Sequence, residues 1–105
     1  MAEQDGSGCS HSAALLSAED IKSALVDLPG WEYDAQQKVL TKRFDFKGFY
    51  KTMAFVNAVA WVANKQQHHP DMQIGYNYAL INWQTHAADG VTKADITCAT
   101  LIEQM

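Results

Sequence analysis

The apolar residues of this chain follow a helical period in three stretches. The longest covers residues 47–66, where apolar side chains recur at steps of three and four: Phe49, Met53, Val56, Ala60 and Ala63. A shorter stretch begins at Ser17, a residue that favours helix N-caps, and ends before Pro29. The last stretch begins at Thr92, and Asp95, three residues later, could complete a capping box with it. Three helices are therefore predicted.

The segments between these helices alternate apolar and polar residues, which is the period of a β-strand. A short strand over residues 31–35 precedes a tight connection and a longer strand over 39–46. Residues 71–85 suit two more strands, with a bend near Gly75 or Asn77. The order α-β-β-α-β-β-α predicts an α+β fold, in which a four-stranded antiparallel sheet carries three helices on one face.

Residues 1–16 follow neither period. They are rich in Gly, Ser and polar residues and cannot offset the entropy lost on ordering, so a disordered leader is expected. Residues 17–105 suit one domain, because 48% of the chain is hydrophobic and no second linker interrupts it. Trp61 and Trp83 are both expected in the core of this domain.

Charge and cysteine content narrow the function classes. The formal net charge of −4 argues against direct binding of nucleic acid, which uses a basic patch. No apolar run approaches the ~18 residues of a membrane span, so no membrane partner is expected. Of the two cysteines, Cys9 falls in the leader and Cys98 in the domain. This spacing argues against a disulfide framework and favours a reducing compartment.

Three histidines flank the predicted second pair of strands. His68 and His69 stand directly before Pro70, and His86 follows Thr85. Pro70 cannot lie inside a regular helix, so the histidine pair belongs where the chain leaves the long helix. An antiparallel strand pair could bring His86 back beside them. Imidazole has an ordinary pKa of ~6.5, so it can give and take protons near neutral pH.

Three interpretations of these histidines compete. They could be structural, held by hydrogen bonds or solvent. They could bind a metal ion, since imidazole is a common zinc and iron ligand. Adjacent histidines chelate one ion poorly, however, and no cysteine joins them. They could also perform metal-free general acid–base catalysis. Asp95 lies nearby in the sequence pattern, although a capping box with Thr92 would account for it without catalysis.

The chain resembles the pterin-4a-carbinolamine dehydratase family over residues 17–105. The matching segments, in this order, are Phe44-Asp45-Phe46, His68-His69-Pro70, Tyr76-Asn77, Thr85-His86 and Gly90-Val91-Thr92-Lys93-Ala94-Asp95. The resemblance implies a hydro-lyase that converts 4a-hydroxytetrahydrobiopterin to quinonoid dihydrobiopterin and water. This reaction recycles the pterin cofactor of aromatic amino acid hydroxylases. It implies no metal and no other cofactor.

The resemblance also suggests roles for the residues. All three histidines count as catalytic: His68 and His86 are taken as the acid–base pair, and His69 as the residue that orients the pterin. Asp95 would fix an imidazole tautomer or meet the substrate. The substrate-binding residues are expected to be His69, Pro70, Thr85 and Asp95.

One position departs from the family pattern, and other functions remain open. Asn64 stands four residues before His68, where the family usually has a charged residue, commonly Glu. A rival function is a non-catalytic dimerisation cofactor of a homeodomain transcription factor, and a third is a pterin-binding protein whose catalysis has lapsed. A homodimer or homotetramer is expected, because a small sheet with open edges invites pairing. The expected location is the cytoplasm, and the nucleus as well.

Overall fold

The computed structural model describes residues 14–105. The elements are α1 (Ala18–Leu25), β2 (Glu32–Asp34), β3 (Val39–Asp45), α2 (Phe49–Gln66), β4 (Asp71–Ile74), β5 (Tyr78–Trp83), the 3₁₀ helix η1 (His86–Ala88) and α3 (Lys93–Glu103). The predicted order α-β-β-α-β-β-α and the α+β class are confirmed. The short helix η1 stands where a plain loop was expected. None of the described helices combines the length and apolarity that crossing a membrane requires.

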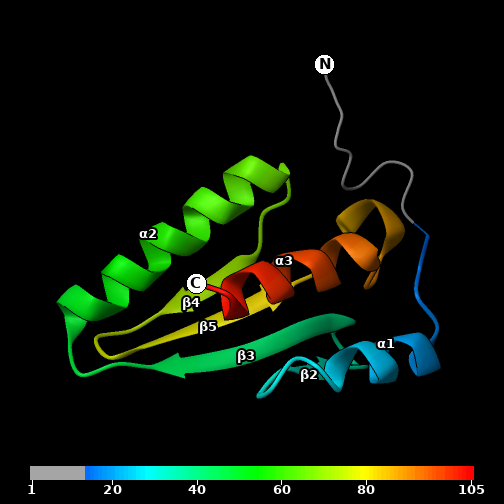
Figure 1. Ribbon diagram of the computed structural model, residues 1–105, viewed down its shortest axis with the longest axis horizontal. Helices are drawn as coiled ribbons and strands as arrows, with labels where there is room; N and C mark the ends of the chain where they lie inside the picture. The colour runs from blue at the N-terminus through cyan, green and yellow to red at the C-terminus, as the bar shows by residue number, and fades with distance from the viewer. Residues whose placement is uncertain (1–13) are drawn as a thin grey trace.

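The four strands form one antiparallel sheet in the order β2-β3-β5-β4. The three helices lie against one of its faces, with α3 over the centre and α1 beside β2 (Figure 1). The end of α2, the helix η1 and the start of α3 gather at one end of the molecule. That end carries His68, His69, His86 and Asp95.

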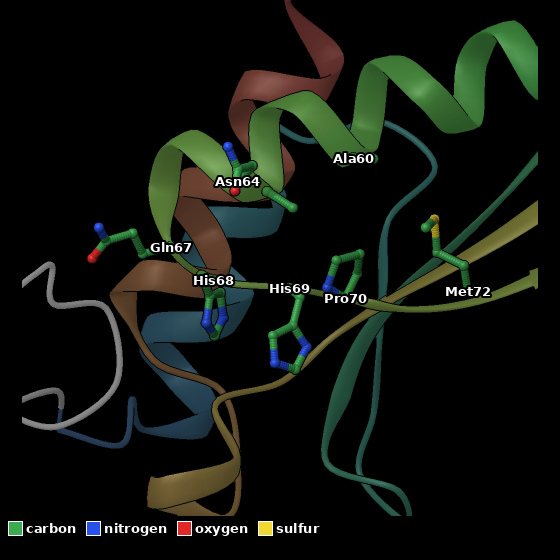
Figure 2. A pocket seen from close by; sticks show the side chains of 8 residues that line it. Ala60, Asn64, Gln67, His68, His69, Pro70 and Met72 are labelled. Atoms are coloured by element: carbon green, nitrogen blue, oxygen red, sulfur yellow. The ribbon is translucent and has the colours of Figure 1, made fainter.

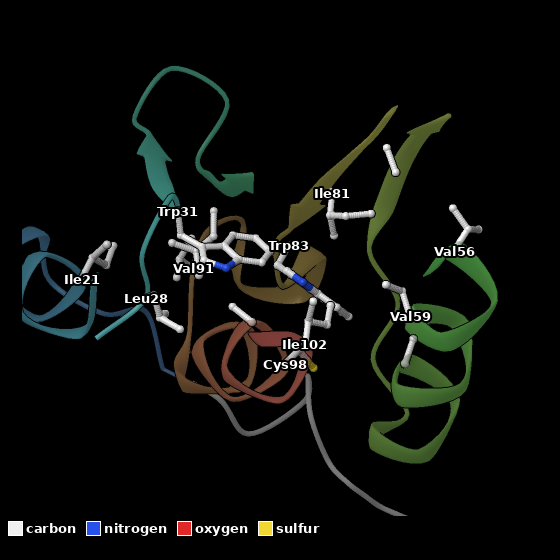
Figure 3. Close-up of a cluster of buried hydrophobic side chains, with 14 residues drawn as sticks. Ile21, Leu28, Trp31, Val56, Val59, Ile81, Trp83, Val91, Cys98 and Ile102 are labelled. Carbon is white, nitrogen blue, oxygen red and sulfur yellow. The ribbon is translucent and has the colours of Figure 1, made fainter. Parts of the chain in front are cut away.

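The core lies between this sheet face and the helices (Figure 3). On β5 the burial alternates strictly, so Ala79, Ile81 and Trp83 face the helices while their neighbours face the other side of the sheet. The helices contribute the apolar residues that complete the cluster, among them Ile21, Val56, Val59, Ala99 and Ile102.

Trp61 was expected in this core, and that prediction is wrong. Its side chain is 63% exposed, on the outer side of α2. The buried face of α2 is turned relative to the predicted one: Val59 and Val62 are buried, whereas Phe49 and Ala60, predicted on the apolar face, are exposed. Trp61 lies on the side of the helix opposite to the buried residues. The ammonium of Lys65 lies 4.8 Å from the Trp61 ring and covers it in part.

The helix caps form as their sequences predict. Ser17 accepts a hydrogen bond from the backbone N–H of Asp20 at the start of α1. At the start of α3, Thr92 and Asp95 form the complete capping box. Both ends of α3 are therefore anchored, since Glu103 near its C-terminal end accepts hydrogen bonds from Lys42 and from the indole of Trp31.

Two residues that precede Ser17 already pair with the backbone just before α3. Leu15 forms a bridge with Thr92, and the N–H of Leu16 donates to the carbonyl of Val91 at 3.0 Å. The expected leader over residues 1–16 thus has ordered contacts at its last residues. Its first thirteen residues, including Cys9, lie outside the described part of the chain.

Candidate active site

A left-handed residue directs the histidine pair away from α2. Gln67 has a φ of 53°, and the N–H of His68 then donates to the carbonyl of Ala63 at 3.1 Å. This hydrogen bond satisfies a carbonyl of the last helical turn, and the helix ends there. Pro70 follows, and β4 begins at Asp71. The chain therefore presents His68 and His69 in an extended segment between helix and strand (Figure 2).

The strand register brings the third histidine to the same place. Asp71 at the start of β4 pairs with Asn82 near the end of β5, and the two strands are antiparallel. Residues just before Asp71 consequently lie beside residues just after Asn82. The predicted return of His86 to the histidine pair is found: the rings of His69 and His86 have centroids 6.2 Å apart.

His68 is buried and held by Asp95. Its Nε2 atom lies 2.5 Å from Oδ1 of Asp95, with the imidazole 6% exposed and the carboxylate fully enclosed. The other carboxylate oxygen, Oδ2, accepts from the hydroxyl of Thr85 at 2.8 Å and from the N–H of Thr92 at 2.9 Å. Because Oδ2 takes two donors, an acceptor role for the Asp95 carboxylate favours the tautomer of His68 that has its proton on Nε2.

The network continues to the two threonine hydroxyls. The Oγ1 atoms of Thr85 and Thr92 are 2.7 Å apart, and both side chains are fully buried. Since the Thr85 proton is directed to Asp95, the hydroxyl of Thr92 donates to Thr85. The capping box of α3 and the His68 contact therefore share one carboxylate, so the structural role and the site role of Asp95 coexist.

Trp83 forms the other boundary of the His68 ring. The two rings are stacked, with centroids 5.6 Å apart and planes 19° apart. Sequence reasoning placed Trp83 in the core, which is confirmed, but it did not connect this residue with the histidines. The antiparallel register could have shown the connection. Asp71 pairs with Asn82, so Trp83, which follows Asn82, lies beside Pro70, which precedes Asp71.

His69 and His86 differ from His68 in their exposure. Both of their side chains are open to solvent, and their rings are tilted by 34° to one another. No ion pair or hydrogen bond of either ring is seen among the described residues. Two solvent-open imidazoles therefore stand side by side, next to the buried and hydrogen-bonded imidazole of His68.

A pocket of about 470 Å³ opens beside this segment (Figure 2), a volume within the range of small-molecule sites. It is lined by Ala60, Ala63, Asn64, Gln67, His68, His69, Pro70 and Met72. The two histidines are the ionisable side chains in this lining, which holds no Asp, Glu, Lys or Arg. The pocket is thus suited to a mostly uncharged molecule with polar edges.

The predicted site residues fall into two groups. His68, His69 and Pro70 line the open pocket, whereas His86 is not part of this lining and only its ring lies near that of His69. Thr85 and Asp95 are fully buried and connect to the pocket through His68. Asn64 and Gln67 line the pocket, as do Ala60 and Met72, which the sequence did not single out. Within residues 14–105, no three His, Cys, Asp or Glu side chains converge in the way that a metal ion needs.

The chain is similar in sequence to known proteins of one family. The family model described as pterin 4 alpha carbinolamine dehydratase matches residues 14–105. A protein of Legionella pneumophila (strain Corby) named "Putative pterin-4-alpha-carbinolamine dehydratase" is 44% identical over 98 residues, which cover 92% of this chain and 87% of that protein. A relative of the same name in Nitrosospira multiformis is 41% identical and covers 92% and 84%.

Two solved structures share the fold. One is a transcriptional coactivator/pterin dehydratase from Brucella melitensis, with a TM-score of 0.81, 31% identity, and coverage of 86% of this chain and 96% of that one. The other is a pterin dehydratase-like protein described as a RuBisCO assembly factor in the alpha-carboxysome. It has a TM-score of 0.60 and 26% identity, and covers 71% of this chain and 87% of its own.

Proposed function

Because this chain belongs to the pterin-4a-carbinolamine dehydratase family, we propose that it dehydrates 4a-hydroxytetrahydrobiopterin to quinonoid dihydrobiopterin. The observation that carries the proposal is that His69, which lines a pocket without Asp, Glu, Lys or Arg, has the solvent-open ring of His86 6.2 Å from its own. The bicyclic pterin is a flat, largely neutral ring system with several polar edges, which matches such a lining.

The reaction needs one proton donor and one proton acceptor. The substrate carries a hydroxyl on a ring carbon next to a ring nitrogen. Protonation of the hydroxyl oxygen lets the nitrogen lone pair form a carbon–nitrogen double bond as the carbon–oxygen bond breaks and water leaves. A base then removes a ring N–H proton, so the quinonoid product is neutral and the two catalytic groups together gain no net proton. Each positioned acid or base contributes ~10²–10⁴-fold.

We assign the proton transfers to His69 and His86. The sequence instead predicts His68 and His86 as the acid–base pair and His69 as the residue that orients the pterin. Burial favours His69 over His68 for proton transfer, because His68 is 6% exposed and its Nε2 atom is paired with Asp95. His68 then serves as an anchor that fixes the backbone of the pair and offers one ring edge to the pocket.

Asn64 is consistent with a neutral binding site. It lies on the last turn of α2, three residues before Gln67, and lines the pocket. An amide can donate and accept hydrogen bonds at the edge of a pterin, whereas a carboxylate can only accept. We expect Asn64→Glu to change KM for the pterin more than it changes kcat.

Decay of the carbinolamine tests the proposal directly. The substrate is generated by an aromatic amino acid hydroxylase or by chemical oxidation of the tetrahydropterin, and its loss is followed by stopped-flow absorbance with and without this protein. Acceleration that saturates with substrate supports the assignment. A decay rate no greater than that given by an equal concentration of free imidazole would refute it.

We also propose a second candidate function, as a docking protein, which rests on the outer face of α2. Tyr50 is 88% exposed and Trp61 63% exposed on this helix, and the helix carries Lys51 and Lys65 without any Asp or Glu. Exposed aromatic residues among positive charges suit an acidic amphipathic segment of a partner. The names of the two solved relatives, a coactivator and an assembly factor, are in keeping with such a role.

The docking proposal is separable from catalysis. The double variant Tyr50→Ser/Trp61→Ser should retain dehydration, because neither residue lines the histidine pocket. It should lose binding of a labelled helical peptide with Glu and Leu at helical spacing, measured by fluorescence anisotropy. Equal binding by the variant and the wild type, or none by either, would count against α2 as a docking face.

Self-association is expected through the edges of the sheet. In the order β2-β3-β5-β4, the strands β2 and β4 lie at the two ends and leave backbone groups for pairing with another copy. Sedimentation equilibrium should give a homodimer or homotetramer at micromolar concentration. A monomer there would contradict this expectation.

A further inference from the structure

We propose that Trp83 is a positioning residue of the histidine site. Its indole face sets the plane of the His68 ring and, through the backbone of His68, the place of His69 relative to His86. The effect on turnover rests on the proposed function. The effect on the His68 ring does not, and it can be measured in the absence of any substrate.

The hydrogen bond to Asp95 alone leaves the His68 ring one free rotation. It fixes the Nε2 atom, 2.5 Å from Oδ1, but Nε2 lies near the axis of the Cβ–Cγ bond, so a rotation about that bond can still tilt the ring plane with little movement of Nε2. The indole of Trp83, with ring planes 19° apart, blocks that rotation on one side. Hydrogen bond and stacked ring together define the position and the orientation of the imidazole.

Trp83 is itself firmly placed. It ends β5, its backbone is paired with Leu40 of β3, and its side chain is fully buried in the cluster of Figure 3. Its Nε1 atom has no hydrogen-bond partner among residues 14–105, so within this part of the chain packing orients the ring. A buried N–H without a partner is unfavourable, and an aliphatic core residue would avoid it. What the indole supplies in return is a wide, flat and rigid surface against His68.

The backbone transmits this placement to the exposed histidine. His69 follows His68 directly, and Pro70 restricts the conformations open to His69. A His68 ring released from its plane would let the segment shift, and with it the 6.2 Å separation between the rings of His69 and His86. A misplacement of about 1 Å in a catalytic group can cost about 100-fold in rate.

Three variants separate a positioning role from simple core filling. Trp83→Val removes the flat surface, while Trp83→Phe keeps an aromatic face and removes the N–H. Trp31→Val is the matched control, because Trp31 is buried in the same cluster but bonds to Glu103 and has its ring contact with Phe44. Folding of each variant is checked by circular dichroism and urea unfolding.

The direct readout is the Nε2 proton of His68, observed by NMR in protein labelled with ¹⁵N-histidine. It should be visible and slow to exchange in the wild type, in Trp83→Phe and in Trp31→Val, and broadened by exchange in Trp83→Val. In parallel, kcat should fall about 10- to 100-fold in Trp83→Val and less than about 3-fold in the other two variants. KM should change little in all of them.

A protected His68 proton in Trp83→Val, with kcat equal to that of Trp31→Val, would overturn the proposal and leave Trp83 as core filling. If Trp83→Val does not fold, Trp83→Met fills more of the space without a flat ring and gives the same comparison. A wild type without dehydratase activity would refute the proposed function alone, since the proton signals still decide the role of Trp83.

Discussion

The imidazole of His68 and the carboxylate of Asp95 form a buried pair, 2.5 Å apart, at the junction of α2 and α3. The carboxylate accepts three hydrogen bonds in all, from His68, from the hydroxyl of Thr85 and from the backbone of Thr92. One side chain thus caps a helix and fixes an imidazole. The relationship makes the stability of the fold and the order of the site depend on the same group.

Replacement of Asp95 by Asn should therefore lower both the stability of the fold and the order of the histidine site. An amide has one acceptor oxygen and must direct its NH₂ group at one of the three donors. We expect Asp95→Asn to lower the free energy of unfolding by about 1–3 kcal/mol, measured with urea, and to lower kcat as well. Asp89→Asn is the control, because that carboxylate is exposed and pairs with the exposed Lys38. Equal stability of the two variants would contradict the account.

A variant of Thr85 can distinguish direct binding of the substrate from support of Asp95. The sequence interpretation made it a substrate-binding residue, whereas its hydroxyl donates to Asp95 from a fully buried position. Thr85→Val keeps the shape and removes this donor. We expect kcat to fall about 3- to 30-fold with KM changed less than about 2-fold. A large rise in KM with kcat unchanged would instead favour direct contact with the pterin.

The far end of α3 should affect stability and not catalysis. Glu103 accepts from Trp31 at 2.9 Å and from Lys42 at 2.6 Å, and the ion pair is largely shielded from solvent. Glu103→Ala leaves both donors without this partner, so we expect a loss of about 1–3 kcal/mol in unfolding free energy. Asp45→Ala breaks the exposed pair with Arg43 and should cost less than about 1 kcal/mol. Neither variant should change kcat more than about 2-fold.

The elements and their order followed from the sequence because local signals agreed with the fold. The periods of α2 and β5, the cap at Ser17 and the box of Thr92 and Asp95 each act within a few residues, and each was predicted. The gathering of His86 with the histidine pair was also predicted, since antiparallel neighbours must return along one another.

Burial within the site could not be predicted in the same way. His68 and His69 are identical and adjacent, and only the left-handed turn at Gln67 decides which of them faces the core. The exposure of Trp61 likewise depends on which side of α2 packs against the rest of the domain. These properties arise from packing between elements distant in sequence, so composition and hydrophobic periodicity do not predict them.

The most direct test of the central claim compares turnover by His69→Ala and His86→Ala with that of the wild type and of His11→Ala. Stopped-flow decay of 4a-hydroxytetrahydrobiopterin should be slower by about 10²–10⁴-fold in each of the first two variants and unchanged in the third. Wild-type rates in both His69→Ala and His86→Ala, with all proteins folded, would show that the exposed imidazole pair does not carry the reaction.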